Sequence, residues 1–333
     1  MNDTIVLPGA PNIPGLTFRR FHGEADYPHM AALIAACKVA DSVERSTTVN
    51  DVANTYHHLD NCDPQTDMLF VEVGGQVIAY GRIWWVEQAD GTRLYLPFGF
   101  LHPAWRGKGI GSSLWDAAEK RAYQIAAAHP QEKPKFLQAE PFDSEKSLVA
   151  LLENRGYKPV RYETHMVRNL SEPFPSAPMP PGLEVLPVKP EHFRPIFIAS
   201  NEAFRDHWGA VDESEEMYKA QLESKDFNPE LWKVAWSGDQ VAGVVHNFIN
   251  NDENEEYKRK RGYTEGICTR RPWRKLGLAR SLLVQSMQMF KEMGMTETAL
   301  SVDSQNLSGA FRLYEGVGYR KVKQQTIYRK PME

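Results

Sequence analysis

A glycine-containing loop occurs twice in this chain of 333 residues, and this duplication limits the possible folds more than any other feature. Residues 102–114 read HPAWRGKGIGSSL and residues 271–283 read RPWRKLGLARSLL, so in each copy the arginine of a Trp-Arg pair is followed three residues later by glycine. Each copy comes after a strand-like run and before a segment with the periodicity of an amphipathic helix. A repeat on this scale indicates two related units in tandem.

Other landmarks recur at a similar spacing. The segment 182–188 is similar to 15–21 at an offset of 167 residues (182 − 15), and the Gly-Tyr pair at 318–319 repeats the pair at 156–157 at an offset of 162 (318 − 156). Offsets that are nearly constant along the chain indicate a tandem duplication with small insertions and deletions.

A proline-rich stretch, residues 171–181, separates the two copies. Proline cannot continue a helix or lie inside a sheet, so this stretch is expected to be a stiff linker. We therefore expect an N-terminal domain at 1–168, a linker at 169–181 and a C-terminal domain at 182–333.

Hydrophobic periodicity and turn residues predict an α/β fold with a mixed sheet in each domain. The strands expected in the first domain are 15–21, 68–73, 77–87, 93–101, 136–140 and a closing strand at 162–168. The expected helices are 25–38, 48–59, 145–154 and one that begins just after the glycine loop.

The loop has the chemistry of an anion site. A strand that leads through glycines into a helix leaves backbone N–H groups unpaired at the positive end of the helix dipole, where they can bind phosphate oxygens. Gly109 and Gly111 allow a close approach because they have no Cβ, and Ala279 is the smallest replacement for Gly111 in the second copy. Basic side chains are expected to add charge beside the phosphates; these are Arg106, Lys108, Arg274 and Lys275.

Composition excludes several other classes of protein. A net charge of −4 argues against a dedicated nucleic-acid binder. Cys37, Cys62 and Cys268 are far apart, so neither a disulfide framework nor a metal site is expected. The sequence lacks the motif of a P-loop and that of a dinucleotide fold. With no leader-like or membrane-spanning segment, a soluble cytoplasmic protein without a membrane partner is expected.

The patterns Arg-x-x-Gly-x-Gly at 106–111 and Arg-x-x-Gly-x-Ala at 274–279 resemble the acyl-CoA pyrophosphate loop of the GNAT superfamily of N-acyltransferases. The resemblance covers residues 15–168 and 182–331. It implies two tandem GNAT domains of α/β class, with acetyl-CoA as the co-substrate. The superfamily includes a tandem layout with a degenerate first half and a working second half.

The resemblance also implies which residues contact the coenzyme. The loops would hold the pyrophosphate, and the backbone of the strand ends before them would pair with the pantetheine amides. The implied positions are Phe100, Leu101, Arg106, Gly107, Lys108, Gly109, Ile110 and Gly111 in the first copy, and Ile267, Cys268, Thr269, Arg274, Lys275, Leu276, Gly277, Leu278, Ala279 and Asn306 in the second.

Tyr314 is the candidate for assisting the leaving thiolate. A phenol titrates at about pH 10 and a thiol at about pH 8.5, so a Tyr O–H beside the sulfur can donate to it. The string 313–319, LYEGVGY, resembles the family's Leu-Tyr-x-x-x-Gly-Phe/Tyr helix end, in which the Tyr usually faces the sulfur. In the first copy Leu152 stands at the position of Tyr314 (314 − 162), and leucine cannot donate a proton.

Two residues are candidates for deprotonating the amine. Glu265 precedes the second loop on the strand expected to pair with pantetheine, and it is either a base or an ordinary outward-facing carboxylate. His207 falls where the first two helices of the second copy meet, a region that lines the acceptor pocket in the superfamily; the alternative is a surface or packing histidine.

The first hypothesis is therefore an N-acetyltransferase that transfers the acetyl group of acetyl-CoA directly to a primary amine of a small molecule, with its active centre in the C-terminal domain. One alternative is a non-catalytic acyl-CoA-binding sensor or scaffold. A further alternative places the reaction in the first copy, whose glycine loop is the better match. The sequence leaves the acceptor and the oligomeric state open.

Overall fold

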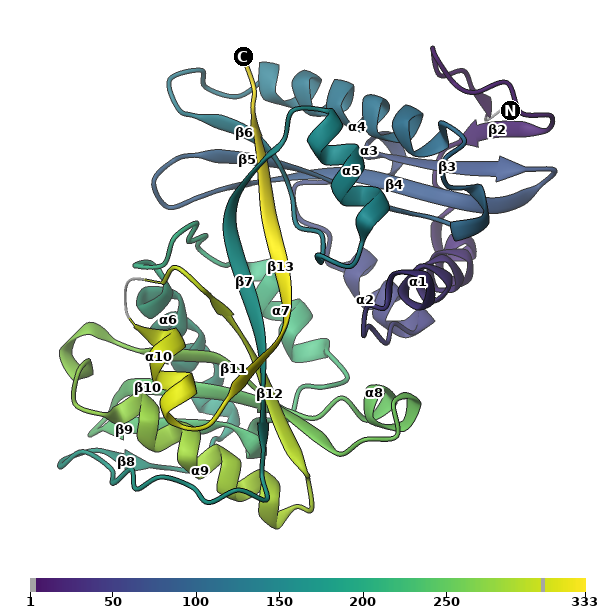
Figure 1. Cartoon of the computed structure of the whole chain (residues 1–333). Helices are drawn as coiled ribbons and strands as arrows, with labels where there is room; N and C mark the ends of the chain where they lie inside the picture. Colours follow the sequence, from purple (N-terminus) through teal and green to yellow (C-terminus); the bar gives the residue numbers. More distant parts are fainter. Residues whose placement is uncertain (1–3, 307–308) are drawn as a thin grey trace. The chain divides into compact units, whose positions relative to one another are not determined.

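The computed structural model describes residues 4–306 and 309–333 (Figure 1). Below, "repeat" refers to the sequence copies 15–168 and 182–331, and "unit" to a compact body of the structure. The first unit comprises Met1–Val160, Glu215–Ala220 and Thr326–Glu333, and the second unit comprises Arg161–Ser214 and Gln221–Gln325.

The sheet of the first unit has strand order β1-β2-β3-β4-β5-β6-β13. Its strands are β1 (Thr4–Ile5), β2 (Leu16–Arg19), β3 (Met68–Val73), β4 (Gln76–Glu87), β5 (Arg93–Leu101), β6 (Lys135–Ala139) and the end of β13 (Arg320–Pro331). β1 to β5 pair antiparallel, β5 and β6 pair parallel, and β6 pairs antiparallel with β13. This is the mixed sheet that the sequence predicts.

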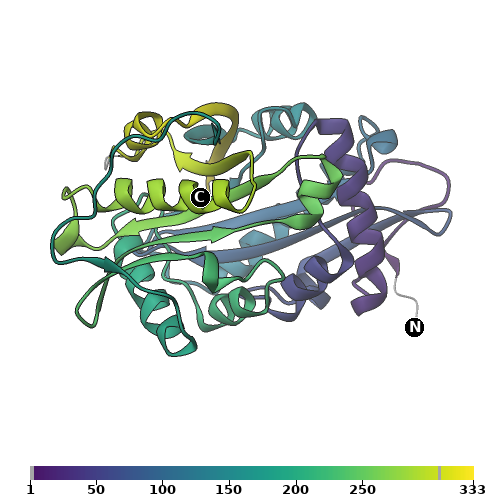
Figure 2. The same ribbon diagram turned by 90° about the horizontal axis from the view of Figure 1, so that it is seen from below.

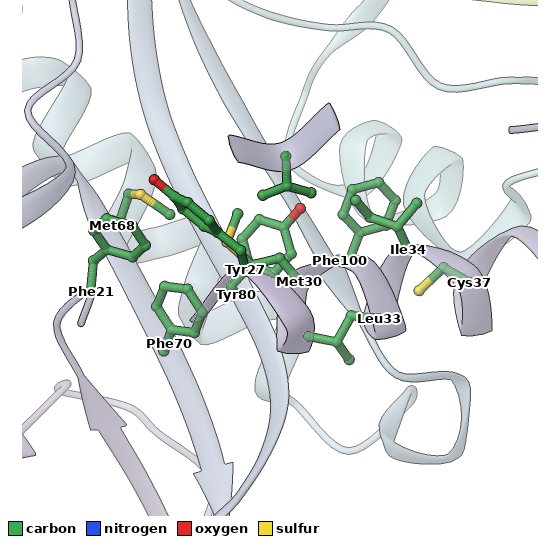
Figure 3. Close-up of a cluster of buried hydrophobic side chains, with 11 residues drawn as sticks. Phe21, Tyr27, Met30, Leu33, Ile34, Cys37, Met68, Phe70, Tyr80 and Phe100 are labelled. Carbon is green, nitrogen blue, oxygen red and sulfur yellow. The ribbon is translucent and has the colours of Figure 1, made fainter. Parts of the chain in front are cut away.

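Helices cover both faces of this sheet. They are α1 (Tyr27–Asp41), α2 (Val49–His57), α3 (Pro64–Asp67), α4 (Ile110–Ala127) and α5 (Lys146–Asn154), with 3-10 turns at Gly23–Asp26 and Pro103–Trp105. On one face α1 packs on aromatic side chains from the strands, including Phe70, Tyr80 and Phe100 (Figure 3). On the other face Ile110 of α4 packs on Val71 and Ile78, as the alternation of side chains along a strand requires. Figure 2 brings α1 (purple) to the front.

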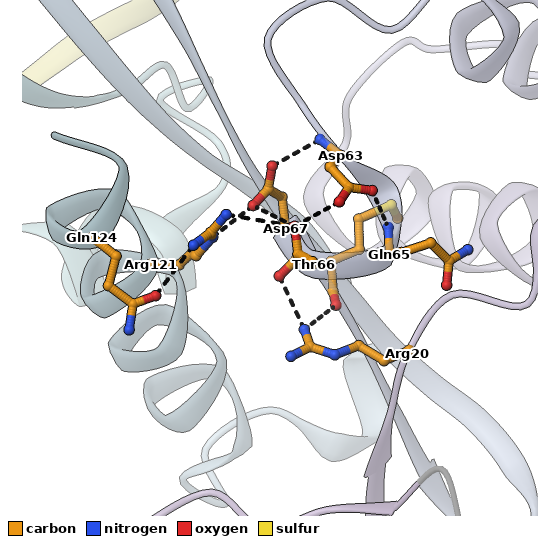
Figure 4. Close-up of polar contacts among 8 residues, drawn as sticks. Arg20, Asp63, Gln65, Thr66, Asp67, Arg121 and Gln124 are labelled. Atoms are coloured by element: carbon orange, nitrogen blue, oxygen red, sulfur yellow. Dashed lines mark hydrogen bonds and ion pairs between the residues drawn. The ribbon is translucent and has the colours of Figure 1, made fainter. Parts of the chain in front are cut away.

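A polar network fixes α4, the helix that begins at the first glycine loop (Figure 4). Arg121 Nε of α4 donates to Asp67 Oδ1 of α3 at 2.7 Å, and Asp67 Oδ2 accepts from the Asp63 N–H at 2.8 Å. Arg20 donates to the carbonyls of Thr66 and Met68 at 3.0 and 3.3 Å. Because Asp67 is buried, this charge pair holds α4 against the start of β3.

The sheet of the second unit has strand order β7-β12-β11-β10-β9-β8. Its strands are β7 (Lys158–Asn169), β8 (Glu184–Val185), β9 (Lys233–Ser237), β10 (Gln240–Phe248), β11 (Arg261–Thr269) and β12 (Glu297–Asp303). Its helical segments are α6 (Phe193–Phe204), α7 (Glu215–Glu223), α8 (Asn251–Glu256), α9 (Leu278–Glu292) and α10 (Ala310–Gly316), with 3-10 turns at Pro190–His192, Pro229–Leu231 and Arg271–Trp273. The first part of α7, Glu215–Ala220, belongs to the first unit. α6 packs on one face of the sheet, and α9 and α10 pack on the other.

The closing strands differ from the sequence expectation. The strand expected at 162–168 to close the first domain lies in the second unit, where β7 pairs antiparallel with β12 from Glu297↔Asn169 to Asp303↔Glu163. The last strand of the second repeat, β13, instead pairs with β6 from Tyr328↔Ala139 to Pro331↔Phe136. Periodicity identifies a strand but carries no information about its partner, so the exchange could not be read from the pattern.

Candidate active site

The two glycine loops have the same backbone conformation. Gly107 and Gly109 have φ of 73° and 84°, and the residues 168 positions later, Lys275 and Gly277, have φ of 63° and 87°. When two residues with left-handed backbone conformation have a single residue between them, the N–H groups of the segment point toward a common centre. They form an anion-binding concavity. Glycine takes this conformation freely, whereas Lys275 is one of the few non-glycine residues of the described chain with positive φ.

Each loop leads into a helix whose first N–H groups have no helical partner. The first helical hydrogen bond of α4 runs from Ser113 N–H to Gly109 O at 3.1 Å, and that of α9 runs from Ser281 N–H to Gly277 O at 3.1 Å. No side chain caps either helix at its N-cap glycine. The N–H groups of residues 110–112 and 278–280 therefore face out of the helix ends, as phosphate binding requires.

The two loop arginines, Arg106 and Arg274, each form an ion pair with a carboxylate. Arg106 forms a bidentate pair with Asp41 at 2.6 and 2.7 Å and donates from Nε to Leu101 O at 3.4 Å. The hydrogen bond to Asp41 is the main cause that raises the pKa of Arg106. Asp41 ends α1, so this arginine ties the loop to the helix on the other face of the sheet.

The second loop repeats this contact. Arg274 donates to Asp206 Oδ2 at 2.5 Å, to Thr269 O at 2.9 Å and to Ala203 O at 3.1 Å. The two arginine bonds from Arg271 and Arg274 lower the pKa of Asp206. Lys108 and Lys275 are exposed beside the loops, as is Arg271 in its pair with Asp206. The unpaired backbone N–H groups at the start of each helix suit phosphate oxygens at both loops.

The remaining predicted loop and strand positions lie around these two loops. Ile110 and Leu278 are buried and anchor the starts of α4 and α9, while Leu276 is exposed. Cys268 is buried, and burial raises the pKa of its thiol to about 11. Phe100 packs in the core between the sheet and α1. Asn306 follows β12 and donates its N–H to Asp303 O at 3.1 Å.

The strand before each loop separates from its parallel neighbour. The β11·β12 ladder ends at Tyr263↔Ala299, and the β5·β6 ladder ends at Tyr95↔Leu137, 168 residues earlier on β5. Within the described chain β11 has no further ladder pair with β12, so the backbone edge of residues 264–269 on that side is open to an extended amide ligand. The predicted pantetheine positions Ile267, Cys268 and Thr269 lie on this edge.

Glu265 lies in the gap where the two strands separate. Its carboxylate Oε1 accepts from Ser301 N–H of β12 at 3.0 Å, in place of a ladder hydrogen bond. Burial, and after it the negative charge of Glu163, raises the pKa of Glu265 to about 8. Glu265 therefore faces into the strand gap and is not an ordinary solvent-facing carboxylate.

Tyr314 belongs to α10 and is 6% exposed in the core between α9 and the sheet. Burial, and after it the charge of Glu265, raises the pKa of Tyr314, so the phenol stays protonated. Glu265 and Cys268 are both among its electrostatic neighbours. The structure therefore brings the predicted phenol and the predicted carboxylate to the same region.

His207 lies elsewhere. It follows α6 in an exposed turn, with its ring 4.8 Å from that of Phe204. Desolvation, and after it the charge of Arg274, lowers the pKa of His207. Among the described contacts none joins it to Glu265 or Tyr314.

The first unit lacks the polar groups of the gap. Glu265 and Ser301 each lie two residues beyond the last β11·β12 ladder pair. The residues two positions beyond the last β5·β6 pair are Pro97 and Ala139. Leu152, aligned with Tyr314, is fully buried in the core of the first unit. The two loops are thus alike, whereas at these three positions the second unit has a carboxylate, a hydroxyl and a phenol and the first unit has Pro97, Ala139 and Leu152.

Sequence reasoning missed two polar residues next to this gap. Ser301 and His165 are directly opposite each other on β12 and β7, and Ser301 Oγ lies 3.1 Å from His165 Nδ1. The exchange of strands brings His165 here, and no local motif signals it.

Residues 4–306 and 309–333 contain no group of three His, Cys, Asp or Glu side chains placed to hold a metal ion. None of their helices is long and apolar enough to cross a membrane.

The sequence matches the acetyltransferase (GNAT) family in two separate ranges, residues 36–132 and 196–319, which together exceed half of the chain. Mycothiol acetyltransferase from Salinispora arenicola (strain CNS-205) is 25% identical over 194 residues, which are 56% of this chain and 58% of that relative. The chain thus matches less than two thirds of that relative's length.

Two solved structures are similar over nearly the whole chain. A GCN5-related N-acetyltransferase from Sphaerobacter thermophilus has a TM-score of 0.71 and 27% identity, with 98% of this chain and 97% of that chain covered. A tandem GNAT protein from the clavulanic acid biosynthesis pathway has a TM-score of 0.65 and 14% identity, with 95% and 98% covered, and at this identity it shows the fold alone.

Proposed function

This chain belongs to the acetyltransferase (GNAT) family as a tandem GNAT acyltransferase, and from this premise we propose that its second unit transfers an acetyl group from acetyl-CoA to a primary amine of a small molecule. The domain at 182–333 would be catalytic, completed by strand β7 from the first repeat. The domain at 1–168 would bind acyl-CoA without turnover or serve as a scaffold.

One observation carries this proposal: the polar groups of the strand gap occur in one unit only. Both units have the loop that suits a pyrophosphate, but Glu265, Ser301 and Tyr314 correspond to Pro97, Ala139 and Leu152. A group that takes a proton and a group that gives one are what acyl transfer from a thioester to an amine requires. The first unit has neither at these positions.

Each residue has a role that follows from its surroundings. The main-chain N–H groups after Gly277 would bind the pyrophosphate, and the open edge of β11 would pair with the pantetheine amides. Glu265 would take the proton of the attacking amine, because a carboxyl group with a pKa of about 8 is close to the working pH that favours a general base. Tyr314 would donate to the departing thiolate. The amine attacks the thioester directly in this scheme.

The first unit supports a second candidate function. It keeps the left-handed glycines and the arginine clamp of the loop, which suit binding, but lacks the proton-transfer groups. A non-catalytic acyl-CoA-binding or sensing role is therefore favoured for this unit specifically.

The test uses the intact chain, because each compact unit contains a strand from the other repeat. Calorimetry measures the binding of acetyl-CoA, and release of free thiol from acetyl-CoA is followed with a panel of small primary amines. We expect binding, and turnover of at least one amine that is lost in Glu265→Gln. A chain that binds acetyl-CoA but acetylates no amine would support the sensor instead, and a chain that binds none would exclude both.

A further inference from the structure

In the first unit a cavity lies between α4, strands β3 and β4, and the N-terminal residues 5–8. Its volume is about 490 Å³, which falls within the range of about 300 to 1,000 Å³ that is usual for small-molecule sites. The glycine loop at 106–111 does not line it. Much of its wall is apolar and is formed by Ile5, Leu7, Leu69, Ile83, Leu114, Ala117 and Ala118.

A glycine on the floor of the cavity leaves this space open. Apart from its chain neighbours, the only heavy atom within 4 Å of a Cβ at Gly81 would be the Phe98 carbonyl oxygen, at 3.4 Å. In the second repeat the residue 164 positions after Gly81 is Val245, which is fully buried and packs with Leu278 and Leu282. A side chain therefore occupies in the second unit the space that Gly81 leaves open in the first.

Two cationic side chains at the cavity have no carboxylate partner. Within residues 4–306 and 309–333, the guanidinium of Arg20 donates only to the carbonyls of Thr66 and Met68, at 3.0 and 3.3 Å. Lys120 of α4 is exposed and forms no ion pair within the same residues. Both residues line the cavity, so two positive charges there are not compensated by the chain.

The two carboxylates at the cavity already have partners. Asp67 accepts from Arg121 Nε at 2.7 Å (Figure 4). Asp116 pairs with Arg155, which follows α5, at 2.8 Å. Neither carboxylate is therefore available to neutralise Arg20. A guanidinium presents its N–H groups in a planar fork that fits the oxygens of a carboxylate or a phosphate. The cavity thus combines an apolar wall with an unmet preference for an anion.

We propose that this cavity binds an aliphatic anion, a small molecule with an apolar chain and an anionic head group. The chain lies between α4 and the strands, against Ala117 and the bare backbone of Gly81. The head group accepts hydrogen bonds from Arg20, and Lys120 adds a favourable charge. This site is distinct from both glycine loops, and the inference does not depend on acetyl transfer.

The test measures probe binding to the intact chain by calorimetry. Acetyl-CoA is present in excess, so that an acyl chain does not bind at a coenzyme site instead. The probes are octanoate, octyl phosphate and neutral octanol, which share one chain length. We expect at least one anion to bind roughly 10-fold more tightly than octanol, the effect of one hydrogen bond between charged groups. The tighter anion identifies the head group as a carboxylate or a phosphate. Equal affinity for all three probes, or no binding of either anion, would overturn the proposal.

Two variants fill the cavity from opposite sides. Gly81→Val introduces the residue that the second repeat has at this position, and Ala117→Leu adds a larger side chain from α4. Each should weaken binding of the anion roughly 10-fold or more, since about 0.8 kcal/mol is lost for each CH₂ of the chain that is no longer buried. Ala127→Leu is the matched control, because Ala127 is exposed at the end of α4 and outside the cavity. Wild-type affinity in both filling variants would place the anion elsewhere and refute the site.

Two charge variants test recognition of the head group. Arg20→Gln should weaken binding of the anion by about 10-fold, and Lys120→Gln by about 3-fold, because an exposed charge contributes less. Neither should change the affinity for octanol. Lys146→Gln is the control, since Lys146 is exposed at the start of α5 and does not line the cavity. An equal loss of octanoate and octanol binding in Arg20→Gln would show that Arg20 only supports the fold, and the assigned head-group contact would be wrong.

Discussion

Replacing Tyr328 by alanine is expected to destabilise the first unit, although Tyr328 belongs to the second repeat. Its side chain is 6% exposed and packs with Leu137 and Tyr157 in the core of the first unit. Its hydroxyl donates to Glu153 Oε1 at 3.1 Å. Truncation of a buried aromatic side chain costs about 3 to 5 kcal/mol. At the lower value, a unit that opens cooperatively would exchange its protected amides roughly 100-fold faster.

Hydrogen exchange followed by mass spectrometry measures this effect by segment. Faster exchange is expected in peptides from β6, α4 and α5, which share the core with Tyr328, and unchanged exchange in peptides from β12 and α9. Tyr328→Phe is the control, because it keeps the packing and removes only the hydroxyl, at a cost of about 1 kcal/mol. Met166→Ala is the reciprocal variant: Met166 is fully buried in the second unit, so exchange should accelerate in β12 and α9 instead.

If Tyr328→Ala accelerated exchange in β12 and α9 while leaving β6 protected, each repeat would close its own sheet, and the exchanged pairing of β7 and β13 would be wrong.

Three further predictions concern the chemistry. In the wild type, kcat/KM for the acceptor should fall as the pH drops below about 8, because Glu265 must be ionised to act as a base, and Glu265→Gln should lose this dependence together with most activity. Tyr314→Phe should lower kcat by about 10-fold or more while the calorimetric affinity for acetyl-CoA stays near the wild-type value, and an unchanged kcat across the pH range would rule out its acid role. Gly277→Val should weaken acetyl-CoA binding at the second loop, because a β-branched residue is strained at φ of 87°. The paired variant Gly109→Val, at φ of 84°, should abolish any separate binding at the first loop. If both variants bound as many molecules of acetyl-CoA as the wild type, the loop assignment would be contradicted.

Local patterns were sufficient for the parts of the site that are continuous in sequence. Spacing of apolar residues predicted the helices after both loops, and the glycines predicted a left-handed turn that the structure has at Gly109 and Gly277. Glu265 and Tyr314 were candidates because each stands at a fixed distance from a recognisable motif. Their placement in one region follows from the order of strands that the family resemblance implied.

Contacts between distant parts of the chain could not be predicted in this way. The partners of the loop arginines, Asp41 and Asp206, lie 65 and 68 residues away from Arg106 and Arg274. A basic residue near a glycine loop favours a phosphate contact when the sequence is considered alone, since no periodicity signals a carboxylate from another helix. His165 was missed for the same reason, because its place beside Ser301 depends on which sheet its strand joins.

The exchange of closing strands also makes the second repeat structurally dependent on the first. β12 has β7 along one side, and β7 comes from the first repeat. A shortened gene encoding only the second repeat would leave that side of β12 bare, and an unpaired edge invites aggregation. The second repeat therefore depends on the first for the edge of its own sheet.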